Sequence, residues 1–377
     1  MFYLKQYDTE LLSFEIDDMP LEGQKCRIVS VNEQSKTLFP IGMNPDNESL
    51  MKWLRGRVIP KNREYVDALL AKNGLAHGDT RGILRISCGL SLNDSYWITE
   101  DVFEGTYHDC NLYEHKFDAA QSQLAFTGTG SLHIKGSSFS PEFTTGGMLR
   151  KGWRRINRKV MLYKGGTSGA ANAGNEPYSE YYASQIAEQM GIRHVSYQLS
   201  MWKHCLCSTC ELFCDINTSY VPIYRFMDNY SLPVVAEYLK QLGEDFYSDF
   251  VDMLIFDCLI YNEDRHFGNF GLMVDNHANK PVSFAPVFDH GLSLFNYAMP
   301  DHFDDLASYA ETRLSAYGIS FDAIAKEFIT ARQKEKLRKM IGFRFVRHPH
   351  YNLPSYRLKA IERHLQKRLH QLLQMNP

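Results

Sequence analysis

The sequence predicts an α+β fold with a β-rich N-terminal half and a mainly helical C-terminal half. Three observations predict it: short apolar runs alternate with turn residues over 1–45, extended patterns return over 194–227, and the apolar spacing becomes helical from residue 231 onward. A chain of 377 residues with 44% hydrophobic and 23% charged residues is globular and long enough for two or three lobes. We expect the two halves to divide near residue 228.

The N-terminal half is expected to mix strands with helices. Residues 48–72 predict two helices separated at Pro60, and Asn73-Gly74 closes the second because glycine accepts a left-handed backbone. Lys164 is placed at the end of a strand. The predicted strands lie within residues 1–45, 82–88, 124–126 and 158–163.

The clearest predicted helix covers residues 177–190. Tyr182, Ile186 and Met190 are spaced four apart and form its apolar face, and Gly191 ends it. Beyond it the patterns predict two or three strands within 194–227, helices at 232–242 and 246–261, a strand pair at 270–274 and 282–288, and mostly helix over 303–377.

The net charge of −3 hides a strong asymmetry. Residues 331–377 hold 12 Lys and Arg against 2 Asp and Glu, a local charge of +10, which leaves −13 for residues 1–330. This excludes a chain that is basic over its whole surface. Three interpretations of the basic segment stay open: the solvated face of a packed helix, a surface for nucleic acid or an acidic protein, and docking against the acidic remainder. The apolar stripe of that helix is Leu358, Ile361, Leu365, Leu369 and Leu372.

The cysteines and the hydropathy pattern favour a cytoplasmic protein without membrane association. Eight cysteines are too few and too irregular for a disulfide framework, and neither an apolar leader nor an apolar run of membrane-spanning length is present. Cys205, Cys207, Cys210 and Cys214 lie next to His204, which raises a zinc site as an alternative. Their spacing lacks paired C-x₂-C motifs, so thiols on a strand are favoured.

The strongest chemical signal joins Asp264, Asn269 and Asp289. Asp264 and Asn269 are five positions apart in a turn between a predicted helix and strand, which is the spacing of a protein-kinase catalytic loop. Asp289 follows twenty residues after Asn269, past the predicted strand pair, in Asp-His-Gly. An ionised Asp can orient an attacking hydroxyl, while amide and carboxylate oxygens suit Mg²⁺. The alternative is that these residues only cap local turns.

The N-terminal half supplies groups that could hold phosphates. Gly146 and Gly147 follow two threonines and precede a basic stretch, so their backbone N–H groups could cover phosphates. Lys164 is expected to bind phosphate from its strand end, with Glu180 on the next helix as its partner. Glu176 and Glu188 lie on the same helix and are alternative partners.

The block Asp264-Arg265-His266-x-x-Asn269 with the downstream Asp289 resembles the HipA-like kinases. These are bacterial Ser/Thr kinases of the protein-kinase-like superfamily, named for a toxin–antitoxin component. The resemblance covers roughly residues 138–295 and departs from the family in its Thr-Gly-Gly-Met loop. It implies a two-lobed protein-kinase-like fold, with an accessory subdomain over 1–120, an ATP-binding small lobe over 121–228 and a helical catalytic lobe over 229–377.

The resemblance also implies roles for single residues. Asp264 would be the catalytic base, and Asn269 and Asp289 would hold Mg²⁺. Lys164 would contact the α- and β-phosphates with Glu180 as its partner. The remaining implied contacts are His266 near the phosphates, Gly146 and Gly147 over them, Tyr224 and Phe226 at the adenine, and Asp228 at the ribose.

The expected function is ATP- and Mg²⁺-dependent phosphoryl transfer to a Ser or Thr hydroxyl of an unidentified protein. Autophosphorylation at Thr144 or Thr145 is a further hypothesis, because a phosphate there would add about −1.5 to −2 charge beside the γ-phosphate. An antitoxin-like or DNA-binding protein is the expected partner. Two alternatives stay open: a non-catalytic nucleotide-sensing protein in a repressor or toxin–antitoxin complex, and a lipid kinase, because phosphoinositide kinases share the Asp-Arg-His-x-x-Asn loop.

Overall fold

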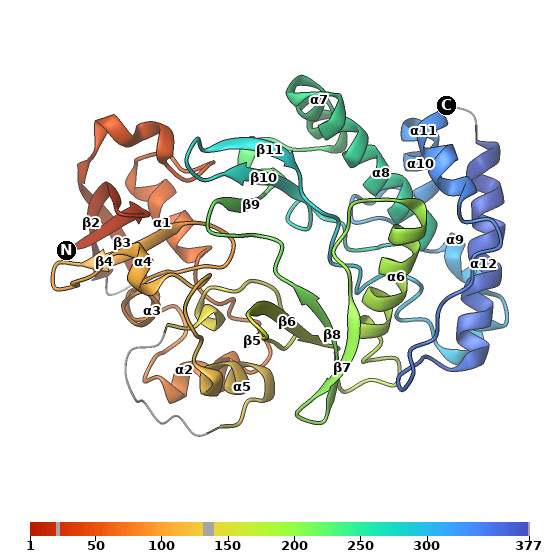
Figure 1. The fold of residues 1–377 in the computed structure, drawn as a ribbon, viewed down its shortest axis with the longest axis horizontal. Helices are drawn as coiled ribbons and strands as arrows, with labels where there is room; N and C mark the ends of the chain where they lie inside the picture. Colours follow the sequence, from red (N-terminus) through yellow and green to blue (C-terminus); the bar gives the residue numbers. More distant parts are fainter. Residues whose placement is uncertain (20–22, 131–138, 376–377) are drawn as a thin grey trace. The chain divides into compact units, whose positions relative to one another are not determined.

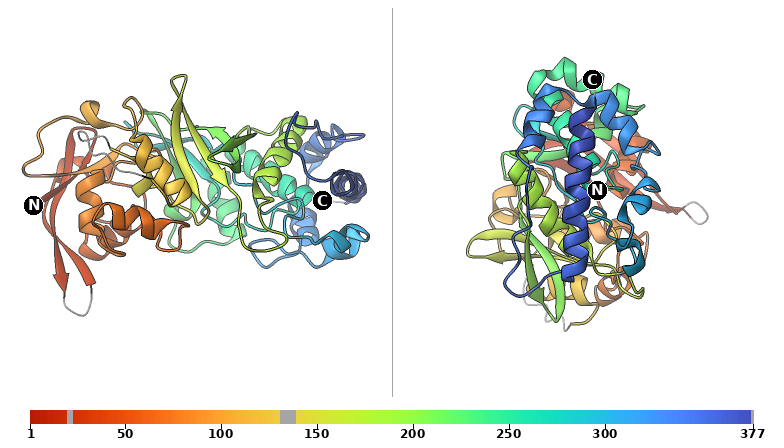
Figure 2. Two further views of the ribbon diagram at one scale, coloured as in Figure 1. Left: turned by 90° about the horizontal axis from the view of Figure 1, so that it is seen from below. Right: turned by 90° about the vertical axis from the view of Figure 1, so that its right-hand side faces the viewer.

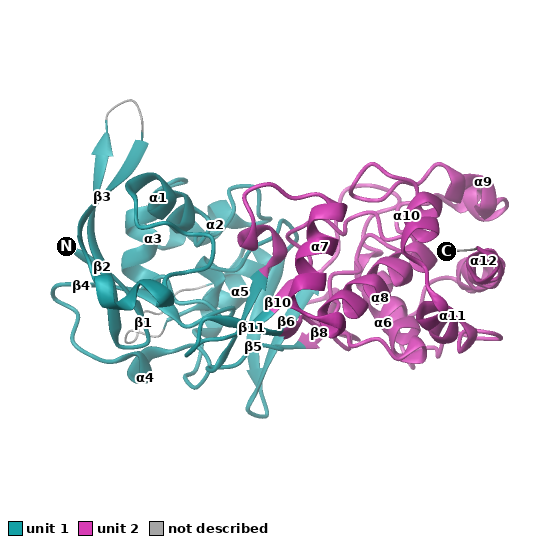
Figure 3. Ribbon diagram, turned by 90° about the horizontal axis from the view of Figure 1, so that it is seen from above, with its two compact units in different colours: residues 1–164, 211–221, 273–282 teal, residues 165–210, 222–272, 283–377 magenta. Residues whose placement is uncertain are grey.

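The computed structural model describes residues 1–19, 23–130 and 139–375. Its chain forms two compact units that are each built from three separate segments (Figure 3). Unit 1 comprises Met1–Lys164, Glu211–Val221 and Met273–Val282, and unit 2 comprises Gly165–Cys210, Pro222–Leu272 and Ser283–Pro377. The last two residues of the basic segment, 376 and 377, lie outside the described residues.

Unit 1 is built around an antiparallel four-stranded sheet with the strand order β3-β2-β1-β4. Side chains of this sheet pack against α1 in one apolar cluster, in which Leu4, Phe14, Leu50 and Leu54 are fully buried. The elements that lie wholly or mostly in this unit are β1 (Phe2–Gln6), β2 (Thr9–Met19), β3 (Gly23–Val31), α1 (Asn47–Arg55), α2 (Val66–Lys72), α3 (Thr80–Ser87), β4 (Tyr96–Glu100), α4 (Tyr107–Cys110), α5 (Ala119–Thr127), β5 (Lys151–Ile156), β6 (Lys159–Gly165), β9 (Thr218–Pro222), β10 (Gly271–Asp275) and β11 (Lys280–Phe284).

Two predicted strands in unit 1 are helices. Residues 82–88 lie mostly in α3, where the Asp79 side chain accepts a hydrogen bond from the Gly82 N–H and caps the helix. Residues 124–126 lie in α5, which begins at a similar cap formed by Asp118. Such caps satisfy backbone donors that a helix start leaves open, and a short apolar run fits either structure until the cap is considered.

Unit 2 is mainly helical, and α8 lies at its centre. Residues 250–260 of α8 are all buried, and the helix packs against α7, α10, α11 and α12 (Figure 1). The elements here are α6 (Glu176–Met190), β7 (Gln198–Trp202), β8 (Cys205–Glu211), α7 (Leu232–Leu242), α8 (Glu244–Ile260), α9 (Leu306–Glu311), α10 (Phe321–Phe328), α11 (Ala331–Arg338) and α12 (Ser355–Gln374). The hairpin of β10 (Gly271–Asp275) and β11 (Lys280–Phe284) has only its base in this unit, because residues 273–282 belong to unit 1.

Most of the predicted elements of unit 2 are confirmed. The predicted helix at 177–190 is α6, its face of Tyr182, Ile186 and Met190 is buried, and Gly191 ends it at a positive φ of 70°. The predicted strand at 282–288 is displaced, since β11 ends at Phe284. The right-hand view of Figure 2 shows α12 as one long helix, and its stripe of five apolar residues is buried.

Several basic side chains of residues 331–377 form hydrogen bonds and ion pairs inside unit 2. Arg368 donates a hydrogen bond to the Cys258 carbonyl, and Arg357 donates to the carbonyls of Phe295 and Asn296. Lys336 and Arg332 form ion pairs with Asp252 of α8. These contacts support the interpretation that part of the positive charge is docked against acidic and carbonyl groups of the same unit. Among the described residues, no helix is both long and apolar enough to cross a membrane.

Candidate active site

The candidate catalytic loop begins where α8 ends. Tyr261 has a left-handed backbone with φ 53°, and its N–H returns to the Asp257 carbonyl, which terminates the helix. Asn262 is fully buried directly after this turn. Because the last turns of α8 are enclosed by the core, the loop that follows starts from a fixed base.

Asp264 and Asn269 lie together in this loop. The Asn269 side-chain N–H₂ donates to the Asp264 carbonyl at 2.9 Å and lies 3.5 Å from the Asp264 carboxylate. The backbone closes the loop on the same side, because the Asn269 N–H donates to the carbonyl of His266 at 2.9 Å. Since the amide nitrogen of Asn269 is turned toward Asp264, its oxygen points elsewhere and suits a metal ligand.

His266 shapes the loop from its exposed side. Its Nδ1 accepts a hydrogen bond from the Gly268 N–H at 3.0 Å. A Cβ at Gly268 would lie 2.8 Å from the His266 ring, so a side chain at this position would displace the histidine. The structure therefore gives His266 a local role in the turn, and its predicted place near phosphates stays a prediction.

Asp289 occupies a strained backbone position next to the same loop. Its φ is 58°, in the left-handed region that Asp and Asn tolerate better than other side chains. Its N–H donates to the Tyr197 hydroxyl at 3.2 Å, and its carbonyl accepts from Asn262 at 3.5 Å. Asn262 in turn accepts the Asp264 N–H at 3.3 Å. Asn262 thus links the backbones of Asp264 and Asp289, and Asn269 joins them through its bond to Asp264.

Glu180 contacts the Asp-His-Gly segment. It is fully buried, and its Oε2 accepts a hydrogen bond from the His290 N–H at 2.8 Å. Glu176 is also buried and accepts from the backbone and hydroxyl of Thr167, whereas Glu188 is exposed. Lys164 belongs to unit 1, whereas these three carboxylates belong to unit 2. The pairing of Lys164 with any of them therefore stays a prediction.

Two residues predicted to contact adenine lie in a 3₁₀ turn, Ile223–Phe226. Phe226 packs against the core of unit 2, and its ring lies 5.8 Å from that of Tyr238. Tyr224 is half-buried and would lie 3.9 Å from a Cβ at Gly268, so it is close to the catalytic loop. Asp228 is exposed beyond the turn. Their contacts with a nucleotide stay a prediction.

The glycine loop of unit 1 is held through its carbonyls. Arg63 is buried and donates to the carbonyl oxygens of Thr145, Gly146 and Gly147 at 2.5–2.7 Å. Lys151 donates to the Gly146 carbonyl at 2.9 Å. Burial lowers the pKa of Arg63 to about 10, and the nearby Glu142 opposes that shift. With its carbonyls bound on one side, the loop can turn backbone N–H groups away from Arg63, as a phosphate-covering loop requires.

Comparisons with known proteins bear on the fold of the chain. No protein-family model and no curated protein sequence matches the chain. The HipA chain in a complex of HipA, HipB and operator DNA, from a toxin–antitoxin system of Shewanella oneidensis MR-1, has a similar structure. The similarity covers 98% of this chain and 97% of that chain, with a TM-score of 0.51 and 10% sequence identity. The chain has a HipA-like fold.

A second solved structure is similar over a smaller part. The proinflammatory kinase CtkA of Helicobacter pylori aligns with 59% of this chain and 92% of its own, with a TM-score of 0.47 and 17% identity. The HipA-like fold confirms the predicted α+β, kinase-like fold class. The three-part division at residues 120 and 228 stays a prediction.

Sequence reasoning missed the buried polar groups that hold the candidate site together. They are Asp257, Asn262, Arg265 and Tyr197. One signal could have found the first: Asp257 is an acidic residue in the otherwise apolar stretch 253–261, and a buried charge requires a partner. The Tyr197 contact joins residues 92 positions apart, so no local spacing indicates it.

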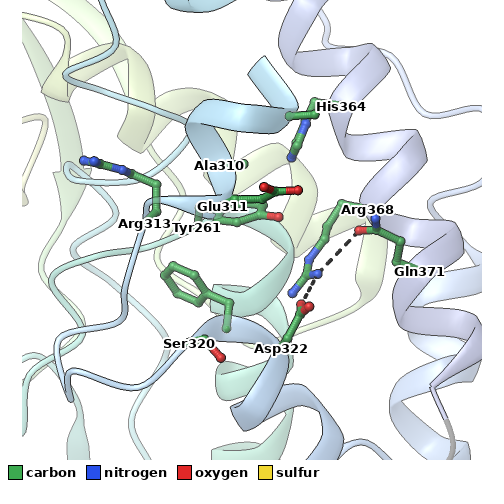
Figure 4. Close-up of a pocket in the computed structure, with 11 residues that line it drawn as sticks. Tyr261, Ala310, Glu311, Arg313, Ser320, Asp322, His364, Arg368 and Gln371 are labelled. Carbon is green, nitrogen blue, oxygen red and sulfur yellow. Dashed lines mark hydrogen bonds and ion pairs between the residues drawn. The ribbon is translucent and has the colours of Figure 1, made fainter. Parts of the chain in front are cut away.

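A separate cavity of ≈ 220 Å³ lies in unit 2 beside Tyr261 (Figure 4). Arg368 of α12 points toward Asp322 of α10 across it, and the two form an ion pair. Burial and the positive charge of Arg368 lower the pKa of His364 to about 4, so this imidazole is neutral at pH 7. Arg313, also on its lining, lies 3.5 Å from Glu263, the neighbour of Asp264.

The zinc alternative finds no support in the described part of the chain. No group of three or more His, Cys, Asp or Glu side chains there could hold a metal ion. Cys207, Cys210 and Cys214 are buried around β8, as expected for thiols in a strand-rich core.

Proposed function

We propose that the chain is a kinase that transfers the γ-phosphoryl group of ATP, with Mg²⁺, to a Ser or Thr hydroxyl of a protein. The observation that carries the proposal is that Asn262 binds both Asp264 and Asp289, while Asn269 binds Asp264, in a HipA-like fold. A lapsed, merely nucleotide-sensing protein would not need this complete set of side chains.

The residues present fit a magnesium site. The Asn269 amide nitrogen is committed to Asp264, which leaves its oxygen for a cation, and Asp289 is held in a strained conformation of the kind that clusters at functional sites. Asn269 and Asp289 would hold the ion. When bound, Mg²⁺ supplies charge neutralisation for the transferring phosphoryl group.

The protein groups would divide the remaining work. The Asp264 carboxylate orients the acceptor hydroxyl and accepts its proton. Gly146, Gly147 and Lys164 of unit 1 bind phosphate oxygens, while Tyr224, Phe226 and Asp228 bind the nucleoside. Because phosphoryl transfer depends mostly on positioning and charge, these roles suffice without a covalent intermediate on the protein.

The partner proposal rests on the HipA structure, which is a complex with HipB and DNA. We infer that an antitoxin-like, DNA-binding protein is the natural partner of this chain too. Direct nucleic-acid binding through residues 331–377 is the weaker proposal, because four of their basic side chains are committed inside unit 2.

The test is transfer from labelled ATP with Mg²⁺ to a general protein acceptor and to the chain itself. Asp264→Ala should lose about 10²–10⁴-fold of the rate, the range for general base catalysis, while keeping the thermal unfolding midpoint. Glu327→Gln, which changes an exposed carboxylate of α10, is the matched control and should keep full activity. Undiminished transfer by Asp264→Ala would overturn the assignment, and transfer to phosphoinositide but not to protein would favour the lipid kinase.

A further inference from the structure

We propose that Arg265, held by Asp257, is a positioning residue that fixes the backbone of Asn269 against that of Asp289 and so sets the geometry of the metal site. This inference rests on the proposed phosphoryl transfer, and it assigns a role to the middle residue of the Asp-Arg-His block. Arg265 is 1% exposed, so it does not reach solvent or a substrate.

Every N–H group of the Arg265 guanidinium is used. A guanidinium carries five N–H donors in a planar fork. Nε donates to Asp257 Oδ2 at 2.8 Å, and Nη2 donates to Asp257 Oδ1 and to His290 Nδ1, both at 3.1 Å. Nη1 donates to the Asn269 carbonyl at 2.9 Å and also to the Phe288 carbonyl. No other side chain can make this set of five bonds from one plane.

The two bonds of Nη1 connect the two proposed metal ligands. Asn269 is one ligand, and Phe288 directly precedes the other, Asp289. One nitrogen therefore holds the backbones of the two segments that would supply the proposed metal ligands. A displacement of about 1 Å in such a constellation can cost about 10²-fold in rate.

Asp257 fixes Arg265 from the core. It lies on α8, is 4% exposed, and its Oδ1 also accepts a hydrogen bond from Asn262 at 3.1 Å. Burial alone would lower the pKa of Arg265, but the Asp257 carboxylate outweighs it and raises this pKa, so the guanidinium stays charged. Asp257, Arg265 and Asn262 thus form a buried clasp around the catalytic loop.

The Asp-His-Gly segment contributes the last contact. His290 Nδ1 accepts from Arg265, which assigns the ring proton of a neutral imidazole to Nε2, and the His290 N–H is bound by Glu180. Buried ion pairs are not in general more stabilising than apolar packing. The Arg265–Asp257 pair lies between the two segments that carry the proposed metal ligands, so we expect it to fix their positions.

The decisive variant is Arg265→Lys, which keeps the charge but offers three donors from a single point. We expect the Mg²⁺ concentration for half-maximal phosphoryl transfer to rise about 10–100-fold, as for other groups that orient metal ligands. Arg368→Lys is the control, because Arg368 is also buried, at 3% exposure, and pairs with Asp322 away from the catalytic loop. It should lower the thermal unfolding midpoint and leave the Mg²⁺ dependence unchanged.

A second variant covers the case that Arg265→Lys does not fold. The double substitution Asp257→Asn with Arg265→Gln removes both buried charges together and leaves neither unpaired. If it folds and keeps the native Mg²⁺ dependence, the clasp has no positioning role and the proposal is overturned.

Electron paramagnetic resonance can measure Mn²⁺ binding in the presence of β,γ-imido-ATP. This measurement tests the role of the clasp in metal binding without requiring phosphoryl transfer. One outcome separates the two proposals: the native chain transfers no phosphoryl group, yet Arg265→Lys binds Mn²⁺ more weakly than the native chain does. This outcome would support the clasp and overturn the proposed kinase activity. Equal Mn²⁺ binding in both chains, or none in the native chain, would overturn the clasp whatever the activity.

Discussion

At the scale of single residues, the site depends on a backbone conformation that few side chains accept. Asp289 has a φ of 58° and sits between the Tyr197 hydroxyl and Asn262. The strain is tolerated because Asp belongs to the residue types with the lowest cost in the left-handed region. Charge and conformation at this position can therefore be tested separately.

Asp289→Asn and Asp289→Ala should differ in stability but not in activity. Both remove the carboxylate that we propose as a metal ligand, and both should abolish Mg²⁺-dependent transfer. Only the alanine is forced into an unfavourable left-handed backbone, which should reduce the free energy of unfolding by about 1–2 kcal/mol more than the asparagine. Urea denaturation of both variants measures this difference, and equal stabilities would contradict the strain argument.

A second residue-scale prediction concerns Glu142 below the glycine loop. Burial raises the pKa of its carboxyl from 4.5 to about 7, although the Trp153 N–H and Arg63 oppose the shift. The folded state therefore favours the protonated form. The contribution of Glu142 to the free energy of unfolding is therefore greatest below pH 4.5. It falls by up to about 3 kcal/mol as the pH rises toward 7.

Glu142→Gln should remove that part of the pH dependence. Denaturation at pH 5 and pH 8 gives the free energy of unfolding for the native chain and the variant. The variant should lose less stability between the two pH values, with Glu327→Gln as a control that behaves like the native chain. Parallel pH profiles for Glu142→Gln and the native chain would show that Glu142 is ionised throughout.

At the scale of elements, α12 shows how an amphipathic pattern becomes a docked helix. Leu369 is fully buried on its apolar stripe, whereas Arg363 of the same helix is exposed. Leu369→Ala should reduce the free energy of unfolding by about 2–5 kcal/mol, because a buried leucine leaves a cavity. Arg363→Ala should change it by less than about 0.5 kcal/mol. Thermal unfolding of both variants checks the contrast.

The glycine loop is the element where we expect autophosphorylation. The Thr144 hydroxyl is buried and donates to the Leu90 carbonyl, while Thr145 is more accessible and accepts from the Trp153 indole. Incubation with Mg-ATP should add one phosphate to Thr145, and its charge should then weaken ATP binding. Intact-mass analysis of the native chain and Thr145→Val tests this, and an unmodified loop peptide would contradict it.

At the scale of the whole molecule, periodicity predicted the elements better than short runs did. The 3-4-4-3 stripe of α12 would change faces along a strand and therefore indicates a helix, and the four-residue spacing of α6 continues over two turns up to Gly191. The run at 82–88 is short and mixed, and its structure is decided by Asp79 outside it. The sequence also indicated Asp264, Asn269 and Asp289 through spacing. Arg265 binds the Phe288 carbonyl 23 positions away, which only the folded chain reveals.

Unit 1 depends on two segments that are distant in sequence. The Gln6 side chain donates to the Asn276 carbonyl at 2.6 Å, and the Tyr7 hydroxyl donates to the Ile216 carbonyl at 2.7 Å. A fragment of residues 1–164 would leave these groups without partners. We expect it to lack a cooperative unfolding transition in calorimetry, in contrast to the full chain. A sharp transition in the fragment would show that its first segment is self-sufficient.

The interleaving of segments also limits how such a protein can change by recombination. The chain passes between the units after Lys164, Cys210, Val221, Leu272 and Val282. A single crossover between two related genes therefore divides at least one unit between two parents. The two units are expected to be inherited together, and a chimaera that exchanges either one requires several breakpoints at once.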